Sequence, residues 1–284
     1  MHMRWFPALA ICCLGMGGPA WGQPRSLHVR YSFEVQNAGG GVVENARVLF
    51  MAPVAKTPFQ TLDRLEVDCA NADLSTPRQG IVAANLPFLG PYQTVLVHVE
   101  AALAMDADSG TEAAVDPALL QPGKWVESDD AAIQMQAADL RGKTAEQTAR
   151  NAFRWIRREV QYTSAWEGEA GARYALEHRM GDCTETARLF VALLRAAEVP
   201  ARVVEGFVCS RDQVLRPSQY HDWAEWHDGA RWHVADLQTD AFDVEPADYL
   251  AMGILGGEAD SSVPEFSRFH ASRPELQIRM VGHE

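Results

Sequence analysis

The first third of the chain alternates between apolar and polar residues in short runs. The clearest run places apolar side chains at every second position, namely Leu27, Val29, Tyr31, Phe33 and Val35. This is the period of a strand with one buried face. Further strand candidates follow at 46–51, 62–67, 80–84 and 94–101. Several short strands separated by turn residues predict an antiparallel β-sandwich over residues 23–104, which we expect to serve as a scaffold, lid or substrate-docking domain.

The pattern changes after residue 104. Residues 105–127 are acidic and rich in small residues, prolines and glycines, and are predicted to form a linker. Residues 128–130 can cap a short helix, and Thr144 with Gln147 forms a capping box before apolar residues at helical spacing. Segment 160–163 fits a strand or a connection equally well.

The remainder of the chain mixes helix and strand patterns. A third helix is predicted from Asp182 to just before Pro200, with a continuous apolar stripe. In the tail we expect a helix over 247–254 and a strand over 276–281 that closes an edge of the sheet in this region. The predicted fold class is therefore α+β: an N-terminal antiparallel β-sandwich, then an α+β domain over 128–284.

An apolar run at residues 5–16 follows Arg4 and is too short to span a bilayer. Small residues at Ala20 and Gly22 predict cleavage before Gln23. Residues 1–22 are therefore interpreted as a signal peptide rather than a buried helix, because the run has no polar face. The expectation is export to the periplasm or the medium, with no membrane insertion of the mature chain.

Composition narrows the classes of partner. The net charge of −13 argues against nucleic acid or an anionic membrane surface as a partner, because phosphates would be repelled. Three cysteines remain after the predicted cleavage, so at least one thiol is unpaired within the chain. Cys69 and Cys209 either form a bridge or stay as free thiols. No CxxC or HExxH spacing occurs, so no metal or other cofactor is predicted.

The unpaired thiol of most interest is Cys183, which falls at the first position of the third helix. Asp182 is its predicted N-cap and Glu185 the partner in a capping box. A helix N-terminus carries about half a positive charge, which favours a thiolate, and its free amide groups can stabilise an oxyanion. A buried core cysteine is the alternative, but Cys183 precedes the apolar stripe. The position favours a nucleophile.

A candidate base and its partner follow from a predicted hairpin. Asp228-Gly229 predicts a two-residue turn that places His227 opposite Ala230, and in that register His221 faces Asp236. Side chains directly opposite lie about 4.5–5.5 Å apart at Cβ, so a carboxylate could accept the imidazole N–H. A shift of one residue would separate the pair.

The same register assigns the other two histidines of the hairpin. His233 is predicted on the opposite face, outside the site of His221, and His227 in solvent beside the turn. The predicted catalytic residues are therefore Cys183 as nucleophile, His221 as base and general acid, and Asp236 as the residue that orients the base and stabilises the imidazolium.

These segments resemble the transglutaminase-like superfamily, which shares its core with papain-like cysteine proteases, and in particular its exported bacterial-type members. The resemblance covers residues 144–240 and is carried by three blocks in the family's order, at 181–207, 221–225 and 232–236. It implies the roles given above for Cys183, His221 and Asp236. Families of this type often carry an N-terminal β-sandwich, and no calcium site is similar here.

The chain departs from the family pattern at two positions. Leu237 follows the aspartate where proline is common, and Asp222 follows the histidine where a small residue is frequent. The second oxyanion donor is not identified; Trp166 and Tyr162 are weak candidates that are better explained by packing. Neither departure removes a reacting group.

The predicted function is a cysteine enzyme that attacks a peptide or side-chain amide, forms a thioester, and then hydrolyses it or transfers it to an amine. Its partner is expected to be a protein or peptide substrate. The alternative is a catalytically silent binding or assembly module of the cell envelope. The substrate and the oligomeric state do not follow from the sequence.

Overall fold

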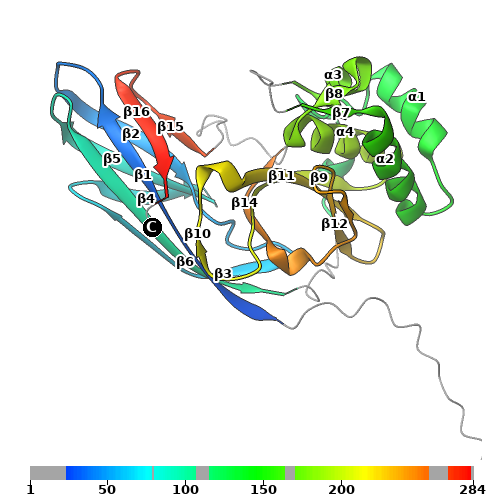
Figure 1. The fold of residues 1–284 in the computed structure, drawn as a ribbon, viewed down its shortest axis with the longest axis horizontal. Helices are drawn as coiled ribbons and strands as arrows, with labels where there is room; N and C mark the ends of the chain where they lie inside the picture. Colours follow the sequence, from blue (N-terminus) through cyan, green and yellow to red (C-terminus); the bar gives the residue numbers. More distant parts are fainter. Residues whose placement is uncertain (1–23, 79, 107–114, 164–169, 256–267, 283–284) are drawn as a thin grey trace, which may run out of the picture.

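The computed structural model describes residues 24–78, 80–106, 115–163, 170–255 and 268–282 (Figure 1). The predicted signal peptide at residues 1–22 and the candidate Trp166 lie outside these residues. A twisted pair of mainly antiparallel sheets forms one side of the molecule, and a third sheet covered by helices forms the other. The predicted α+β class is confirmed.

The N-terminal strands form the sandwich. They are β1 (Arg25–Asn37), β2 (Val43–Met51), β3 (Gln60–Cys69), β4 (Asp73–Arg78), β5 (Ile81–Leu89) and β6 (Thr94–Met105). All five apolar residues of the predicted alternation in β1 are at most 2% exposed, so the expected face is the buried one. Strand β4 was not predicted, because most of its side chains are polar and face solvent.

Later segments complete both sheets of the sandwich. They are β10 (Gln213–Val214), β15 (Phe269–Ala271) and β16 (Leu276–Val281). One sheet has the order β10-β1-β6-β3 with β16 also on β1, and the other has the order β15-β2-β5-β4. The prediction that residues 276–281 close an edge of the sheet in the α+β domain was wrong. The long strand β1 leaves its edge open from Ser32 to Asn37, and β16 pairs there.

The helices lie together in the second half of the chain. They are α1 (Ala131–Leu140), α2 (Ala145–Glu159), α3 (Ala172–His178) and α4 (Cys183–Ala196), with 3₁₀ turns η2 (Pro117–Leu120), η3 (Pro217–Gln219) and η4 (Pro246–Asp248). Asp130 and Thr144 cap α1 and α2 as predicted. The side chain of Gln147 accepts from the N–H of Lys143 rather than from that of Thr144. Helix α3 was not predicted.

The third sheet supports the helices. Its strands are β9 (Ala201–Val208), β11 (Tyr220–His227), β12 (Trp232–Asp236), β13 (Ala241–Phe242) and β14 (Tyr249–Leu255), in the order β13-β12-β11-β9-β14. The helix predicted over 247–254 is instead a 3₁₀ turn and strand β14. A short apolar run fits either form, and here pairing with β9 decides it.

This sheet is buried on both faces. Its helix-facing side contributes Ala224, Trp226 and Ala235 to the core beneath α4. Its other side packs Trp223 and Val234 into a separate cluster, which includes Val54 and Phe59 from the loop between β2 and β3. The sandwich therefore backs the sheet that carries the candidate site. A two-strand parallel ribbon, β7 (Gln161–Tyr162) and β8 (Met180–Gly181), leads into α4.

No helix within the described residues combines the length and apolar character required to cross a membrane.

Candidate active site

Cys183 is the first residue of α4, where the sequence predicted it. Asp182 caps the helix, its carboxylate accepting the Thr184 N–H at 2.8 Å, while the Glu185 carboxylate accepts the Asp182 N–H at 3.1 Å. Such caps typically contribute about 1 kcal/mol. A Cβ on Gly181 would lie 2.6 Å from the Cβ of Glu185, so the close approach of the preceding chain requires glycine. The thiol is half-buried and unpaired.

The rest of α4 fixes this helix start in place. Leu189, Phe190 and Leu193 are at most 1% exposed and lie in the core between the helices and the sheet. Each fully buried side chain of this size contributes roughly 1.5–3 kcal/mol. The buried part of α4 thus anchors its polar first turn, which limits movement of the Cys183 sulfur.

His221 and Asp236 are in contact on the sheet. The imidazole Nε2 lies 2.9 Å from Oδ2 of Asp236, and the Asp236 side chain is fully buried. The other carboxylate oxygen, Oδ1, accepts the backbone N–H groups of Gln238 and Thr239 at 3.1 and 3.2 Å. The Tyr249 hydroxyl donates to Oδ2 at 3.2 Å. These donors hold the carboxylate in one orientation toward the imidazole.

The hairpin register differs from the predicted one by two residues. His227 pairs with Trp232 rather than with Ala230, and Ala224 pairs with Ala235. The Asp228 carboxylate accepts the N–H groups of Ala230 and Arg231, which moves the tight turn one residue along the chain.

The corrected register still brings His221 and Asp236 together. A shift of two residues preserves the face on which each side chain lies, because the strand period is two. Asp236 is therefore a diagonal neighbour of His221 rather than the residue directly opposite. An imidazole is long enough to bridge that diagonal.

The electrostatics of His221 link it to the thiol. Burial lowers the pKa of His221, but its hydrogen bonds with Asp236 and Cys183, together with their negative charges, raise that pKa to about 10. Because Nε2 contacts Asp236, the ring nitrogen available to Cys183 is Nδ1. The imidazole can therefore hold a proton at neutral pH between a carboxylate and a sulfur.

The pKa of Asp236 moves in the opposite direction. Burial alone would raise it, but the hydrogen bond and positive charge of His221 lower it overall, as do the bonds from Thr239. The Asp236 carboxylate is thus ionised at neutral pH, where His221 is protonated.

The other two histidines of the hairpin do not meet Cys183. His233 lies on the helix-facing side of the sheet, as predicted, with Nδ1 at 2.8 Å from Asp243 and Nε2 at 3.0 Å from Asp228. His227 was predicted in solvent, but it is only 4% exposed. Its Nδ1 accepts the N–H of Gly229, and its ring packs edge-on against Trp232.

Two further side chains at the site were missed by the sequence reasoning. Tyr249 comes from a segment predicted as a helix. Thr184, the residue after Cys183, donates its hydroxyl to Asp222, the residue after His221. The departure of Asp222 from the family pattern was the one signal in the sequence that pointed to this contact.

Tyr162 lies close enough to Cys183 for the charge of the thiolate to help raise the pKa of its phenol, after burial, which raises it most. The packing interpretation does not fit Tyr162, because its side chain is 42% exposed.

The remaining described cysteines sit in the sandwich core and are free. Burial raises the pKa of Cys209 to about 11, against a hydrogen bond from Gln213. Burial and the charge of Asp68 raise the pKa of Cys69. Both thiols therefore stay protonated at neutral pH.

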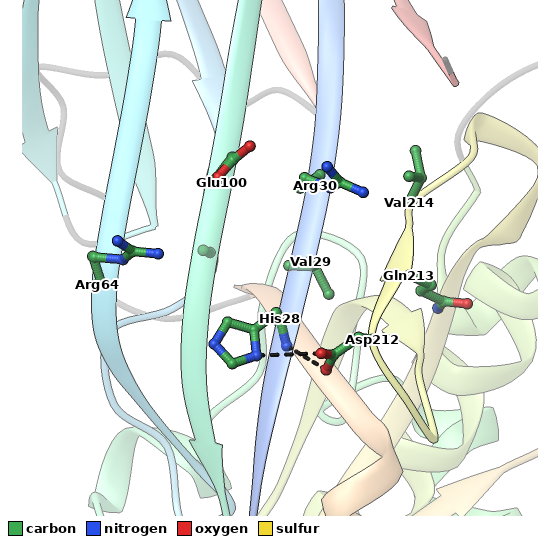
Figure 2. Close-up of a pocket in the computed structure, with 9 residues that line it drawn as sticks. His28, Val29, Arg30, Arg64, Glu100, Asp212, Gln213 and Val214 are labelled. Atoms are coloured by element: carbon green, nitrogen blue, oxygen red, sulfur yellow. Dashed lines mark hydrogen bonds and ion pairs between the residues drawn. The ribbon is translucent and has the colours of Figure 1, made fainter. Parts of the chain in front are cut away.

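A cavity of about 410 Å³ lies elsewhere, on the outer face of the sandwich (Figure 2). Charged and polar side chains line it: His28, Arg30, Arg64, Glu100, Asp212 and Gln213. The His28 ring points toward Asp212, and their side chains approach to 3.3 Å. The cavity lining includes none of the three predicted catalytic residues. No group of three or more His, Cys, Asp or Glu suited to a metal occurs in the described parts of the chain.

The position of the site within the chain can be compared with known proteins. Residues 134–237 match the model of the transglutaminase-like superfamily. This segment contains Cys183, His221 and Asp236 and spans less than half of the chain. The resemblance inferred from the three sequence blocks at 144–240 is supported at the level of a transglutaminase-like domain. No curated protein matches the sequence.

A solved structure with a similar fold is found, and two others align with lower scores. A protein from Cytophaga hutchinsonii, provisionally named a cysteine protease, aligns with a TM-score of 0.57 at 17% identity, over 92% of this chain and 93% of its own. The periplasmic domain of TgpA from Pseudomonas aeruginosa aligns with a TM-score of 0.40 at 17% identity, over 74% of this chain and 88% of its own. A provisionally named protease from Parabacteroides distasonis gives 0.35 at 13% identity, over 73% and 43%. The first likeness indicates a common architecture along nearly the whole chain.

Proposed function

We propose that this chain is a cysteine enzyme that attacks a peptide or side-chain amide through Cys183 and forms a thioester. One observation carries the proposal. A single imidazole, that of His221, contacts a buried carboxylate through one nitrogen and a thiol at a helix start on its other side. Side chains arranged in this way support nucleophilic catalysis by a thiolate.

The residues divide the work as follows. The Cys183 thiolate attacks the carbonyl carbon, and the proton held by His221 passes to the leaving amine. Asp236 keeps the imidazole oriented and stabilises its positive charge. The amide groups of the first turn of α4 can donate to the developing oxyanion. Tyr162 is exposed beside the sulfur and can contact a substrate there.

The fate of the thioester depends on which nucleophile reaches it. Water gives hydrolysis, and an amine gives transfer. We propose hydrolysis as the default, because an exported protein works in a dilute compartment with abundant water. Export itself is part of the proposal and is supported by the signal-peptide pattern of residues 1–22.

The rival function is a silent binding or assembly module that keeps the fold without turnover. Thiol alkylation separates the two. An ordinary thiol with a pKa of about 8.5 is roughly 0.3% thiolate at pH 6, so a thiolate stabilised by an imidazolium reacts up to about a hundredfold faster there.

We expect iodoacetamide at pH 6 to label Cys183 far faster than Cys69 or Cys209, with labelled peptides quantified by mass spectrometry. The buried thiols of the same molecule are internal controls. Equal, slow labelling of all three would favour the binding module.

The substrate can then be sought directly. Released amines and cross-linked products from envelope extracts should differ between the wild-type protein and Cys183→Ala. Free amine without new cross-links would identify a hydrolase, and new isopeptide products would identify a transferase.

A further inference from the structure

The bond between Thr184 and Asp222 joins the neighbour of the nucleophile to the neighbour of the base. Thr184 Oγ1 donates to Asp222 Oδ2 at 2.6 Å. This length falls within the range of a hydroxyl bonded to a carboxylate, which is stronger than a bond between neutral groups. Asp222 is 7% exposed, so water competes little for it. The contact runs from the first turn of α4 to strand β11.

The two ends of this bond are placed by different elements. Thr184 is held by the N-cap of α4, since its N–H donates to Asp182. Asp222 is held by β11, where its backbone pairs with Glu205 on β9. Because side chains alternate along a strand, Asp222 points toward the helix while His221 lies on the other face. Helix and strand therefore meet at a bond one residue away from each reacting group.

We propose that Thr184 and Asp222 form a positioning pair that fixes the Cys183 sulfur relative to the His221 imidazole. This inference rests on the proposed function, in which sulfur and imidazole act together. A misplacement of about 1 Å in such a pair can cost a hundredfold in rate. The side chain of Asp222 contacts α4 rather than the reacting atoms, so its role is to position them.

Charged and polar groups surround the buried Asp222 carboxyl. Burial raises the pKa of Asp222 overall, although the Thr184 hydroxyl and the charges of His221 and Arg188 act in the opposite direction. Arg188 lies one turn along α4 and is itself only 6% exposed.

Glu205 is a second buried carboxyl next to Asp222. It lies directly across from Asp222 on β9 and is 3% exposed. Burial, followed by the charge of Asp222, raises the pKa of Glu205 to about 8. Two buried carboxyls in this arrangement do not both ionise at neutral pH. The Asp222 carboxyl thus shares its buried surroundings with a second carboxyl whose pKa is also raised.

The test compares Cys183 labelling in matched variants of the full chain. Thr184→Val removes the hydroxyl at constant shape, and Thr184→Ser restores it. Thr148→Val on α2 is the control, because that hydroxyl is also hydrogen-bonded but its bonds stay within and next to α2. We expect Thr184→Val to slow iodoacetamide labelling of Cys183 at pH 6 by about tenfold. Thr184→Ser should recover to within about threefold, and Thr148→Val should label as the wild type does.

A double-mutant cycle tests whether the two residues act through one bond. If they do, Thr184→Val combined with Asp222→Ala is no slower than Asp222→Ala alone, within about twofold. Additive losses would overturn the proposal, and so would wild-type labelling in a folded Thr184→Val protein. Asp222→Asn, which keeps an acceptor oxygen, provides a milder variant if Asp222→Ala does not fold.

Hydrogen exchange separates failure of the positioning pair from failure of the proposed function. Loss of the bond should speed exchange in α4 and β11 but not in β1 or β6. Suppose that wild-type Cys183 labels no faster than an ordinary thiol while Thr184→Val still speeds exchange in α4 and β11. The positioning pair is then supported as a contact between helix and strand, and the proposed function is refuted. Unchanged exchange in Thr184→Val refutes the positioning pair itself.

Discussion

His221 and His233 lie on neighbouring strands of one hairpin, both buried and both bonded to aspartate, yet on opposite faces of the sheet. His221 uses Nε2 for Asp236 and leaves its other nitrogen toward Cys183. His233 has a carboxylate at each nitrogen, Asp243 at 2.8 Å and Asp228 at 3.0 Å. Its ring also stacks on Trp226 with the planes 15° apart.

Under the proposed function, a buried histidine–aspartate contact is not sufficient for a catalytic role. The deciding feature is the second ring nitrogen. When a carboxylate also occupies it, the imidazole ties loop to strand, as His233 ties the turn at Asp228 to the segment at Asp243. When it faces a nucleophile, the same contact can prepare a proton transfer.

The largest expected effect comes from replacing each histidine. His221→Asn should slow iodoacetamide labelling of Cys183 at pH 6 by about a hundredfold, because the imidazolium that favours the thiolate is gone. His233→Asn should leave labelling within about twofold. It should instead lower the free energy of unfolding by about 1–3 kcal/mol, since Asp228 and Asp243 lose a buried donor. Urea denaturation measures the change in the free energy of unfolding. Equal losses of Cys183 labelling in both variants would contradict the difference in role between His221 and His233.

A smaller effect is expected from the aspartates. Asp236→Asn should slow Cys183 labelling at pH 6 by about tenfold, because the neutral amide orients His221 less firmly and supports its charge less. Asp243→Asn is the matched change at His233 and should leave labelling unaltered. If Asp243→Asn slowed labelling as much as Asp236→Asn, the effect would have to travel through the sheet rather than through the imidazole.

The sequence predicted local features better than contacts between distant elements. Alternation from Leu27 to Val35 predicted the buried face of β1, and Asp182 with Glu185 predicted the start of α4, because both signals are local. The hairpin register failed because one side chain, Asp228, binds the turn amides.

Features that depend on tertiary partners could not be read from local pattern. Strand β16 pairs with β1, more than two hundred residues earlier in the chain, and β14 is a strand because β9 is available to it. The bonds from Thr184 to Asp222 and from Tyr249 to Asp236 join separate elements in the same way. His221 and Asp236 nevertheless met, because the register error was an even number of residues.

The pH dependence of stability provides a weaker but independent measure of the His221–Asp236 contact. The pKa of His221 is raised to about 10 in the folded chain, against about 6.5 in an unfolded one. Its stabilising contribution is therefore complete below about pH 6.5 and is lost as the pH rises toward 10. The lowered pKa of Asp236 adds a contribution that is lost when the pH falls below about 4.

The measurement is urea denaturation of the wild type and Asp236→Asn at pH 6, 8 and 10. We expect the difference in free energy of unfolding between them to shrink with each step. In a His221→Asn background the same substitution should give a difference that does not change over this range, because the titrating group is absent. A constant difference in the presence of His221 would contradict the raised pKa.

The smallest expected effect is at Tyr249, whose hydroxyl donates to Oδ2 of the Asp236 carboxylate. Tyr249→Phe removes one of its donors at 3.2 Å but leaves His221, Gln238 and Thr239 in place. We expect labelling of Cys183 at pH 6 to fall by about twofold and the free energy of unfolding to fall by about 1 kcal/mol. A loss as large as that of Asp236→Asn would mean that the hydroxyl, rather than the two backbone N–H groups, sets the orientation of the carboxylate.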